Sequence, residues 1–243
     1  MKGIFLQTQL LTVRVKPYED ELLSSFLIRL ANGNGFNILK FCSSFSKSTS
    51  HFFQRSDVEL LDFYPLSLLD IDKLADIANL ESTQLLNCTF MKITSKFSGN
   101  NNSRVRNMTD LIREQLFYCP ECLHEANCYR DIWKLEGVNG CLKHNKNLFD
   151  KCMNCNEVIL YEEINSIGKC PHCDFLLKKS IDKNGEIEEI DKNNILSWMF
   201  LLEDSLLRIE NNELALKLLF LLNEFKDVLD RDLITKNINK HTS

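Results

Sequence analysis

The 243-residue sequence has no apolar run close to the ~20 residues that a helix needs to span a bilayer. Its most apolar stretch, residues 214–222, is interrupted by Lys217 and is typical of a buried helix face. The first residues lack a long apolar core followed by a small-residue cleavage site, so we expect no secretory signal. These absences predict a cytoplasmic protein without a membrane partner, whose cysteines stay reduced.

The sequence also lacks the patterns of common active sites. It has no paired carboxylates on a predicted helix, no glycine-rich phosphate-binding loop, and no serine or cysteine nucleophile with a convincing base. Cys42, Cys88 and Cys128 stand apart from the other cysteines and are most simply buried core thiols. We therefore expect no enzymatic activity.

What the sequence does contain is metal-ligand pairs, between residues 118 and 177. The pairs are Cys119 and Cys122, Cys141 and His144, Cys152 and Cys155, and Cys170 and Cys173. A gap of two residues lets a tight turn direct both side chains at one ion, and zinc takes four such ligands in a tetrahedron. Eight ligands predict two closed sites holding two structural Zn²⁺ ions, with no coordination position left for water or substrate.

The intervals between the pairs predict how they combine. Eighteen residues separate Cys122 from Cys141 and fourteen separate Cys155 from Cys170, as in ordinary zinc-ribbon loops, so we expect sequential pairing. The alternative is the interleaved pairing of a RING-type ubiquitin ligase, which has the same order of ligands. Seven residues separate His144 from Cys152, where a RING has two or three, and this spacing favours ribbons.

The residues before these pairs predict a helical domain over 1–117. Apolar residues at helical spacing indicate a helix over 22–30, with acidic residues in its first turn and Gly33 and Gly35 ending it. A second helix over about 37–45 is expected to pack its Ile38, Phe41 and Phe45 against the first. A further helix is expected over 108–116, leading into the first ligand pair.

Two more short helices, over 71–78 and 82–90, are separated by the three residues 79–81, with Ser82 as the expected cap. This arrangement, over about 70–91, resembles a helix-turn-helix whose second helix would offer Thr83, Gln84 and Asn87 to DNA. An αα hairpin that only packs is the alternative.

The net charge of −5 does not indicate nucleic acid, but one stretch is locally basic. Between residues 92 and 113 a single acidic residue, Asp110, accompanies five basic ones: Lys92, Lys96, Arg104, Arg106 and Arg113. These residues either contact phosphate or form a solvated face. The fold is thus expected to be mainly α with small zinc-ribbon β elements, in three regions: 1–117, 118–180 with tandem zinc fingers, and 181–243 with a C-terminal helical pair over 193–208 and 213–230.

Two segments resemble the TniQ family of transposon target-selection proteins, which includes TnsD. They are KPYEDELLSSFLIRLANGNGF and FYCPECLHEANCYRDIWKLEGVNGCLKHNKNLFDKCMNCNEVI, and the likeness covers about residues 16–177. The resemblance assigns the first four ligands to one finger and the last four to another, and it matches Tyr129, Arg130 and Trp133 to positions between the ligand pairs. From the residues themselves, Trp133 and Leu135 are expected to form a small core, with Arg130 beside them. Phe26 departs from the tryptophan of many relatives.

What the resemblance implies is an adaptor in the bacterial cytoplasm, nucleoid-associated when on DNA. It would link a target-recognising complex, such as an RNA-guided CRISPR effector, to a TnsC-like AAA+ ATPase that recruits the transposase, and it would do so as a possible homodimer. In TnsD-like members the protein itself binds a DNA site. The short sequence after the fingers and the absence of strong positive charge favour the effector-guided arrangement.

Overall fold

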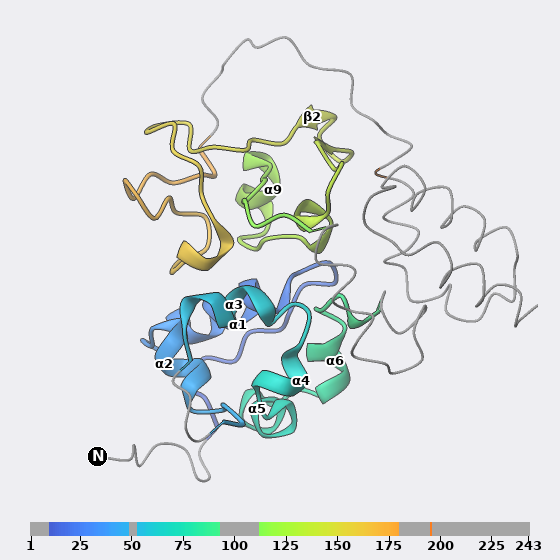
Figure 1. Ribbon diagram of the computed structural model, residues 1–243, viewed down its shortest axis with the longest axis vertical. Helices are drawn as coiled ribbons and strands as arrows, with labels where there is room; N and C mark the ends of the chain where they lie inside the picture. The colour runs from blue at the N-terminus through green and yellow to red at the C-terminus, as the bar shows by residue number, and fades with distance from the viewer. Residues whose placement is uncertain (1–9, 49–52, 93–111, 180–194, 196–243) are drawn as a thin grey trace, which may run out of the picture.

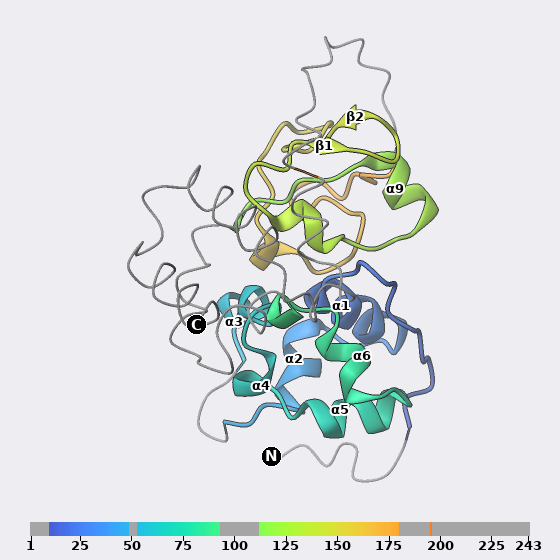
Figure 2. The ribbon, with the colours of Figure 1, turned by 90° about the vertical axis from the view of Figure 1, so that its right-hand side faces the viewer.

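The computed structural model describes residues 10–48, 53–92, 112–179 and Ile195. Figure 1 shows two parts: a helical part, residues 10–92, drawn in blue to green, and a knuckle part, residues 112–179, which carries the metal-ligand pairs. Figure 2, at right angles, shows α1 at the top of the helical part, beneath the knuckle part. The predicted C-terminal helical pair lies outside the described residues, except that Ile195 is helical and buried.

The helical part consists of short helices around one long amphipathic helix. The elements are α1 (Leu23–Gly33), α2 (Ile38–Ser43), α3 (Arg55–Leu60), α4 (Pro65–Leu68), α5 (Ile71–Ala78) and α6 (Ser82–Leu86). The sequence predicts α1, α2, α5 and α6, whereas α3 and α4 were not foreseen. With four to six residues, α3 and α4 offer too few turns for a helical period to be recognised.

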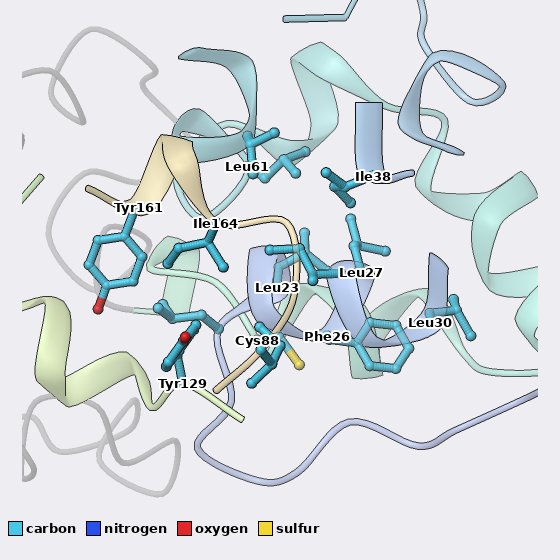
Figure 3. Packing of buried hydrophobic residues seen from close by; sticks show 14 of the residues in the cluster. Leu23, Phe26, Leu27, Leu30, Ile38, Leu61, Cys88, Tyr129, Tyr161 and Ile164 are labelled. Carbon is cyan, nitrogen blue, oxygen red and sulfur yellow. The ribbon is translucent and has the colours of Figure 1, made fainter. Parts of the chain in front are cut away.

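Helix α1 is the centre of the helical part. Its apolar residues Leu23, Phe26, Leu27 and Leu30 are fully buried, and Figure 3 shows Ile38 of α2 beside Leu27, as the predicted packing requires. The predicted acidic first turn is wrong, because the helix begins only at Leu23 and has no acidic residue there. Two of the acidic residues that precede the helix form ion pairs instead, Asp20 with Arg130 and Glu21 with Arg29.

Helices α5 and α6 occupy the predicted helix-turn-helix segment, joined by residues 79–81. Asn79 closes α5 in the left-handed conformation, with φ 56°. The cap of α6 is Glu81 rather than Ser82: Glu81 and Gln84 form a reciprocal capping box, while the Ser82 hydroxyl donates to Asp72 at 2.5 Å. The second helix has five residues and ends at Leu86, earlier than predicted.

The knuckle part begins with an extended segment where a helix was predicted. Residues 112–118 form isolated β-bridges, pairing Ile112 with Leu135, Gln115 with Leu160 and Tyr118 with Phe149. The prediction of a helix over 108–116 is therefore wrong for residues 112–116, and residues 108–111 lie outside the described part. The segment is extended because it forms single bridges with three residues that are distant in sequence.

The remaining elements of the knuckle part are small. They are α9 (Pro120–Glu125), the 3₁₀ helices η2 (Asp131–Lys134) and η3 (Tyr161–Glu163), and the antiparallel strands β1 (Gly140–Cys141) and β2 (Lys146–Asn147). The expectation of a mainly helical chain with few strands is confirmed. No helix among the described residues has the length and apolar character needed to cross a membrane.

One hydrophobic core runs through both parts. Figure 3 shows Tyr129, Tyr161 and Ile164 of the knuckle part packed beside Leu23 and Leu61 of the helical part. Helix α3 packs directly on η3, and the figures place these two elements side by side. The boundary predicted at residue 117 stays a prediction, but the two parts share their core.

Candidate metal centres

The eight predicted ligands converge in two groups. The first group consists of Cys119, Cys122, Cys141 and His144, and the second of Cys152, Cys155, Cys170 and Cys173. Within each group all ligand atoms lie within 4.8 Å of one another. Sequential ligand pairs share a group, whereas a RING would interleave them. The geometry therefore favours the ribbon arrangement over the ubiquitin-ligase alternative.

The spacing of the ligand atoms fits a tetrahedral ion. With zinc–sulfur distances of about 2.3 Å, the sulfur atoms of a tetrahedron stand about 3.8 Å apart. The Sγ atoms of Cys122 and Cys141 are 3.6 Å apart, and each of the pairs Cys152–Cys173 and Cys155–Cys170 is 3.7 Å apart. A disulfide requires about 2.05 Å, and all ten cysteines are free. The donor set and its geometry thus fit two closed metal sites.

The histidine of the first group is oriented by a carboxylate. Nδ1 of His144 lies 3.4 Å from each of the three Sγ atoms of its group, so this nitrogen faces the point where an ion would bind. Nε2 on the opposite side of the ring lies 3.2 Å from Oε1 of Glu125, and Oε2 of the same carboxylate accepts from Lys143 at 2.5 Å. A carboxylate on the outer nitrogen fixes the ring and strengthens a metal-bound imidazole.

Three of the four ligand pairs share one backbone conformation after their second ligand. The residue directly after the second ligand adopts a left-handed conformation in each: Asn145 with φ 51°, Asn156 with φ 61° and Asp174 with φ 57°. Asn and Asp tolerate this conformation better than other non-glycine residues, which explains the residue type at these positions. The first pair differs because Cys122 continues into α9.

Short β-pairings close the same three turns. Cys141 pairs with Lys146 within β1 and β2, while Lys151 pairs with Val158 and Lys169 with Leu176. The amide of Cys152 donates to Glu157 at 3.0 Å, and the amide of Cys170 donates to Phe175 at 2.9 Å. Each turn is thus held by the backbone, which directs both ligands to one point.

The thiols of each group compete for protons. Hydrogen bonds with neighbouring thiols lower the pKa of Cys141, and the largest of these effects comes from Cys119. Hydrogen bonds with Cys122 and Cys141 raise the pKa of Cys119. In the second group the Phe175 amide lowers the pKa of Cys173 to about 6, whereas burial raises that of Cys170 to about 12. A divalent cation is what allows all these sulfurs to be thiolates together.

Cysteines outside the two groups behave as predicted. Cys42, Cys88 and Cys128 are buried, and burial raises the pKa of Cys88 and of Cys128 to about 12. Their burial confirms the prediction that these cysteines belong to the core. The predicted core is also confirmed: Trp133 and Leu135 are buried, and the Arg130 guanidinium lies 5.9 Å from the Trp133 ring.

Five of the polar and basic residues predicted to contact nucleic acid lie in the described part of the chain. Thr83, Gln84 and Asn87 are exposed on and just after α6, although Gln84 also serves the capping box. The ammonium group of Lys92 lies 2.5 Å from Asp131, and the Lys92 side chain is only 11% exposed. Lys96, Arg104 and Arg106 lie outside the described residues. Arg113 is buried and donates to the Val138 carbonyl at 2.7 Å.

Comparison with known protein families shows the family to which this chain belongs. The TniQ family model matches residues 12–148, which is more than half of the chain. The chain belongs to the TniQ family. No curated protein sequence matches it significantly. Membership in the TniQ family implies a role in transposition target selection, with contacts to the transposition machinery and to DNA. The first metal group lies inside the matched region and the second lies beyond it.

Sequence reasoning missed the residues that join the metal groups to the rest of this TniQ protein. The loops between the ligand pairs, 123–140 and 156–169, carry η2 and η3, and both enter the shared core. Some polar residues at the same contact, such as Lys134 and Asp62, are buried, but no pattern in their neighbouring sequence indicates this burial. Each of them looks like an ordinary surface residue in the sequence.

Proposed function

We propose that this TniQ protein is a target-selection adaptor that bridges a target-recognising complex, such as an RNA-guided CRISPR effector on DNA, and the AAA+ ATPase of a transposon. The observation that carries the proposal is the family match over residues 12–148, which includes α1 and the first metal group. An adaptor needs two surfaces at a fixed separation. The core shared by the helical and knuckle parts supplies such rigidity.

The two metal groups serve this function as structural zinc sites. Seven thiolates and one imidazole suit zinc, and four protein ligands complete each tetrahedron. A closed site offers no position for a substrate, so the ions hold shape and take no part in chemistry. This function is bacterial and cytoplasmic, and the protein acts without a catalytic centre of its own.

The competing proposal is a TnsD-like selector that reads a DNA site itself through Thr83, Gln84 and Asn87. Their exposure favours it. Against it stand the length of α6, which has five residues, and the ion pair that holds Lys92. A recognition helix must place several side chains in the major groove, and a single short helical turn limits how many can reach base edges.

The deciding experiment is co-purification with the ATPase and with a CRISPR effector, each tested separately after nuclease treatment. We expect capture by both, and weak duplex binding by the purified protein alone. High-affinity, sequence-specific and strongly salt-dependent duplex binding with no capture by the effector would favour the TnsD-like proposal. A variant carrying Arg104→Glu and Arg106→Glu tests the basic segment, because unchanged DNA binding and transposition would exclude its phosphate contact.

A further inference from the structure

The loop between Cys122 and Cys141 does more than close the first metal group. Its segment Tyr129–Lys134, here called the clamp, enters the helical part and pairs with the residues just before α1. The Leu22 amide donates to the Tyr129 carbonyl at 3.0 Å, and the Asp131 amide donates to the Asp20 carbonyl at 2.9 Å. The clamp thus adds backbone pairing to the start of α1.

A buried ion pair lies at the end of the clamp. Nζ of Lys134 lies 2.9 Å from Oδ2 of Asp62, and both side chains are fully buried. The same carboxylate accepts from the amide of Ser24 at 2.8 Å and from its hydroxyl at 2.9 Å. Asp62 therefore connects the clamp with the first turn of α1. Burying two charges costs desolvation, so such a pair fixes one geometry more than it adds stability.

Two further contacts hold the clamp on the helical part. The Tyr129 amide donates to the Ser25 hydroxyl at 2.9 Å, and this hydroxyl in turn donates to Glu21 at 2.8 Å. Asp131, also buried, pairs with Lys92 at 2.5 Å. The clamp is thereby joined to the helical part at two places, at the start of α1 and after α6.

Both ends of the loop that carries the clamp are metal ligands. With the metal bound, Cys122 and Cys141 are held within one tetrahedron, and the loop presents the clamp from fixed ends. Without the metal, the entropy of closing this loop opposes the docking of the clamp. Since linkage is reciprocal, whatever the metal adds to docking of the clamp, the docked clamp adds to the affinity for the metal.

We propose that metal binding in the first group is thermodynamically coupled to the packing of α1, through the clamp Tyr129–Lys134 and its buried Lys134–Asp62 pair. Loss of the first metal would then loosen the start of α1, about residues 20–25, and not only the metal site. This inference rests on the proposed metal sites and adds to them a metal-sensitive control over the helical surface of the adaptor.

The first test changes the clamp without touching a ligand. The double variant Lys134→Met with Asp62→Asn replaces the charged pair by a neutral one and keeps an acceptor for Ser24. We expect its affinity for cobalt(II) in the Cys₃His group, measured by chelator competition and visible absorption, to fall at least about tenfold. The Cys₄ group serves as the internal reference. The control Lys40→Met, at an exposed lysine of α2, makes the same lysine-to-methionine change away from both groups and is expected to leave both affinities within about threefold.

The second test reads the coupling from the opposite side and covers the case in which the double variant does not fold. In Cys141→Ser, amide hydrogen exchange at Leu22 and Ser24 is expected to be at least about tenfold faster than in the wild type. The same amides in Cys155→Ser are expected to change less. Unchanged exchange in Cys141→Ser, or unchanged first-group affinity in the folded double variant, would overturn the coupling.

The same titration separates this inference from the proposed sites. If the wild-type protein binds fewer than two metal equivalents, the proposed pair of sites fails. If it binds two while the clamp variant keeps its affinity, only the coupling fails. Neither readout requires the ATPase or the effector, so failure of the adaptor proposal is detected separately, by co-purification.

Discussion

Each metal group brings four ligand atoms within 4.8 Å of one another, but the two groups are connected differently to the rest of the molecule. The loop of the first group reaches the helical part with a fully buried ion pair, Lys134–Asp62. The loop of the second reaches it with the apolar residues Tyr161 and Ile164, and with hydrogen bonds near the surface, such as the one from Arg55 to the Glu162 carbonyl at 3.2 Å.

This difference indicates which group depends more strictly on its contacts with the helical part. Apolar contacts tolerate small shifts, whereas a buried charge without its partner is strongly destabilising, by about 3–5 kcal/mol. The family match includes the first group and ends before the second. The buried ion pair therefore ties the first group to the helical part more strictly than apolar contacts tie the second.

The largest expected effect comes from removing one ligand of either group. Cys155→Ser should lose the second metal, and Cys141→Ser should lose the first metal and destabilise the helical part as well. Structural zinc contributes about 10–16 kcal/mol in finger peptides, so both changes are severe. We expect metal content to fall in both variants and the melting temperature to fall further in Cys141→Ser. A Cys155→Ser variant that keeps two zinc ions and wild-type melting would contradict the second site.

A smaller effect is expected from the contact that joins the two loops. The Gly168 amide of the second loop donates to the Tyr129 hydroxyl of the first at 3.1 Å. Tyr129→Phe leaves this buried amide without an acceptor and should lower the free energy of unfolding by about 1–3 kcal/mol. Tyr18→Phe, at an exposed tyrosine, should change it by less than about 0.5 kcal/mol. Denaturant unfolding of both variants measures the difference, and equal values would mean that the loops are not joined there.

The affinity of both groups for metal is expected to fall with acidification. Metal binding must displace the protons that the raised pKa values of Cys119 and Cys170 keep on these thiols, so the affinity rises with pH, by about tenfold per unit for each proton released. At His144, burial opposes the charged form, but hydrogen bonds with Cys141 and Glu125 outweigh it and raise the pKa.

The first group must therefore also displace the His144 proton at low pH, and its pH dependence should steepen there. Chelator competition across pH measures both slopes. Glu125→Gln should reduce the extra slope of the first group, while the second group of the same variant should keep its slope. A first-group slope that does not steepen on acidification in the wild type would show that the histidine adds no proton.

The smallest expected effect is local to one turn. Asn156 has φ 61°, where a side chain with a β-carbon costs about 1–2 kcal/mol. Asn156→Ala should therefore lower stability by about 1 kcal/mol, while Asn156→Gly should be neutral or slightly stabilising. Thermal unfolding of the metal-loaded variants tests this. A destabilisation by glycine as large as by alanine would mean that the asparagine side chain, rather than its backbone conformation, holds the turn.

Much of the candidate site was predictable because metal ligation is a local pattern. Two residues between ligands and ribbon-like intervals predicted the groups that the structure brings together. Helices α1 and α5 were also predictable, because Leu23, Leu27 and Leu74 belong to apolar stripes that repeat along a single element.

Other features escaped prediction because they depend on distant partners. Residues 112–116 are extended, since they pair with residues near Leu135 and Leu160 rather than with one another. The prediction that Ser82 caps α6 was wrong because the Glu81 side chain accepts from the Gln84 amide instead. Residue type alone does not show which of two neighbouring side chains caps a helix.

The sequence by itself determined which side chains form the two candidate metal groups, in what order, and which face of α1 is apolar. Only the tertiary structure decided that Lys134 forms an ion pair with Asp62 and that the loops of both metal groups pack against the helical part. The physical reason is how far apart along the chain the interacting residues lie. Tight turns and helical stripes are set by neighbours along the chain, whereas buried charges find their partners only when the shared core excludes water.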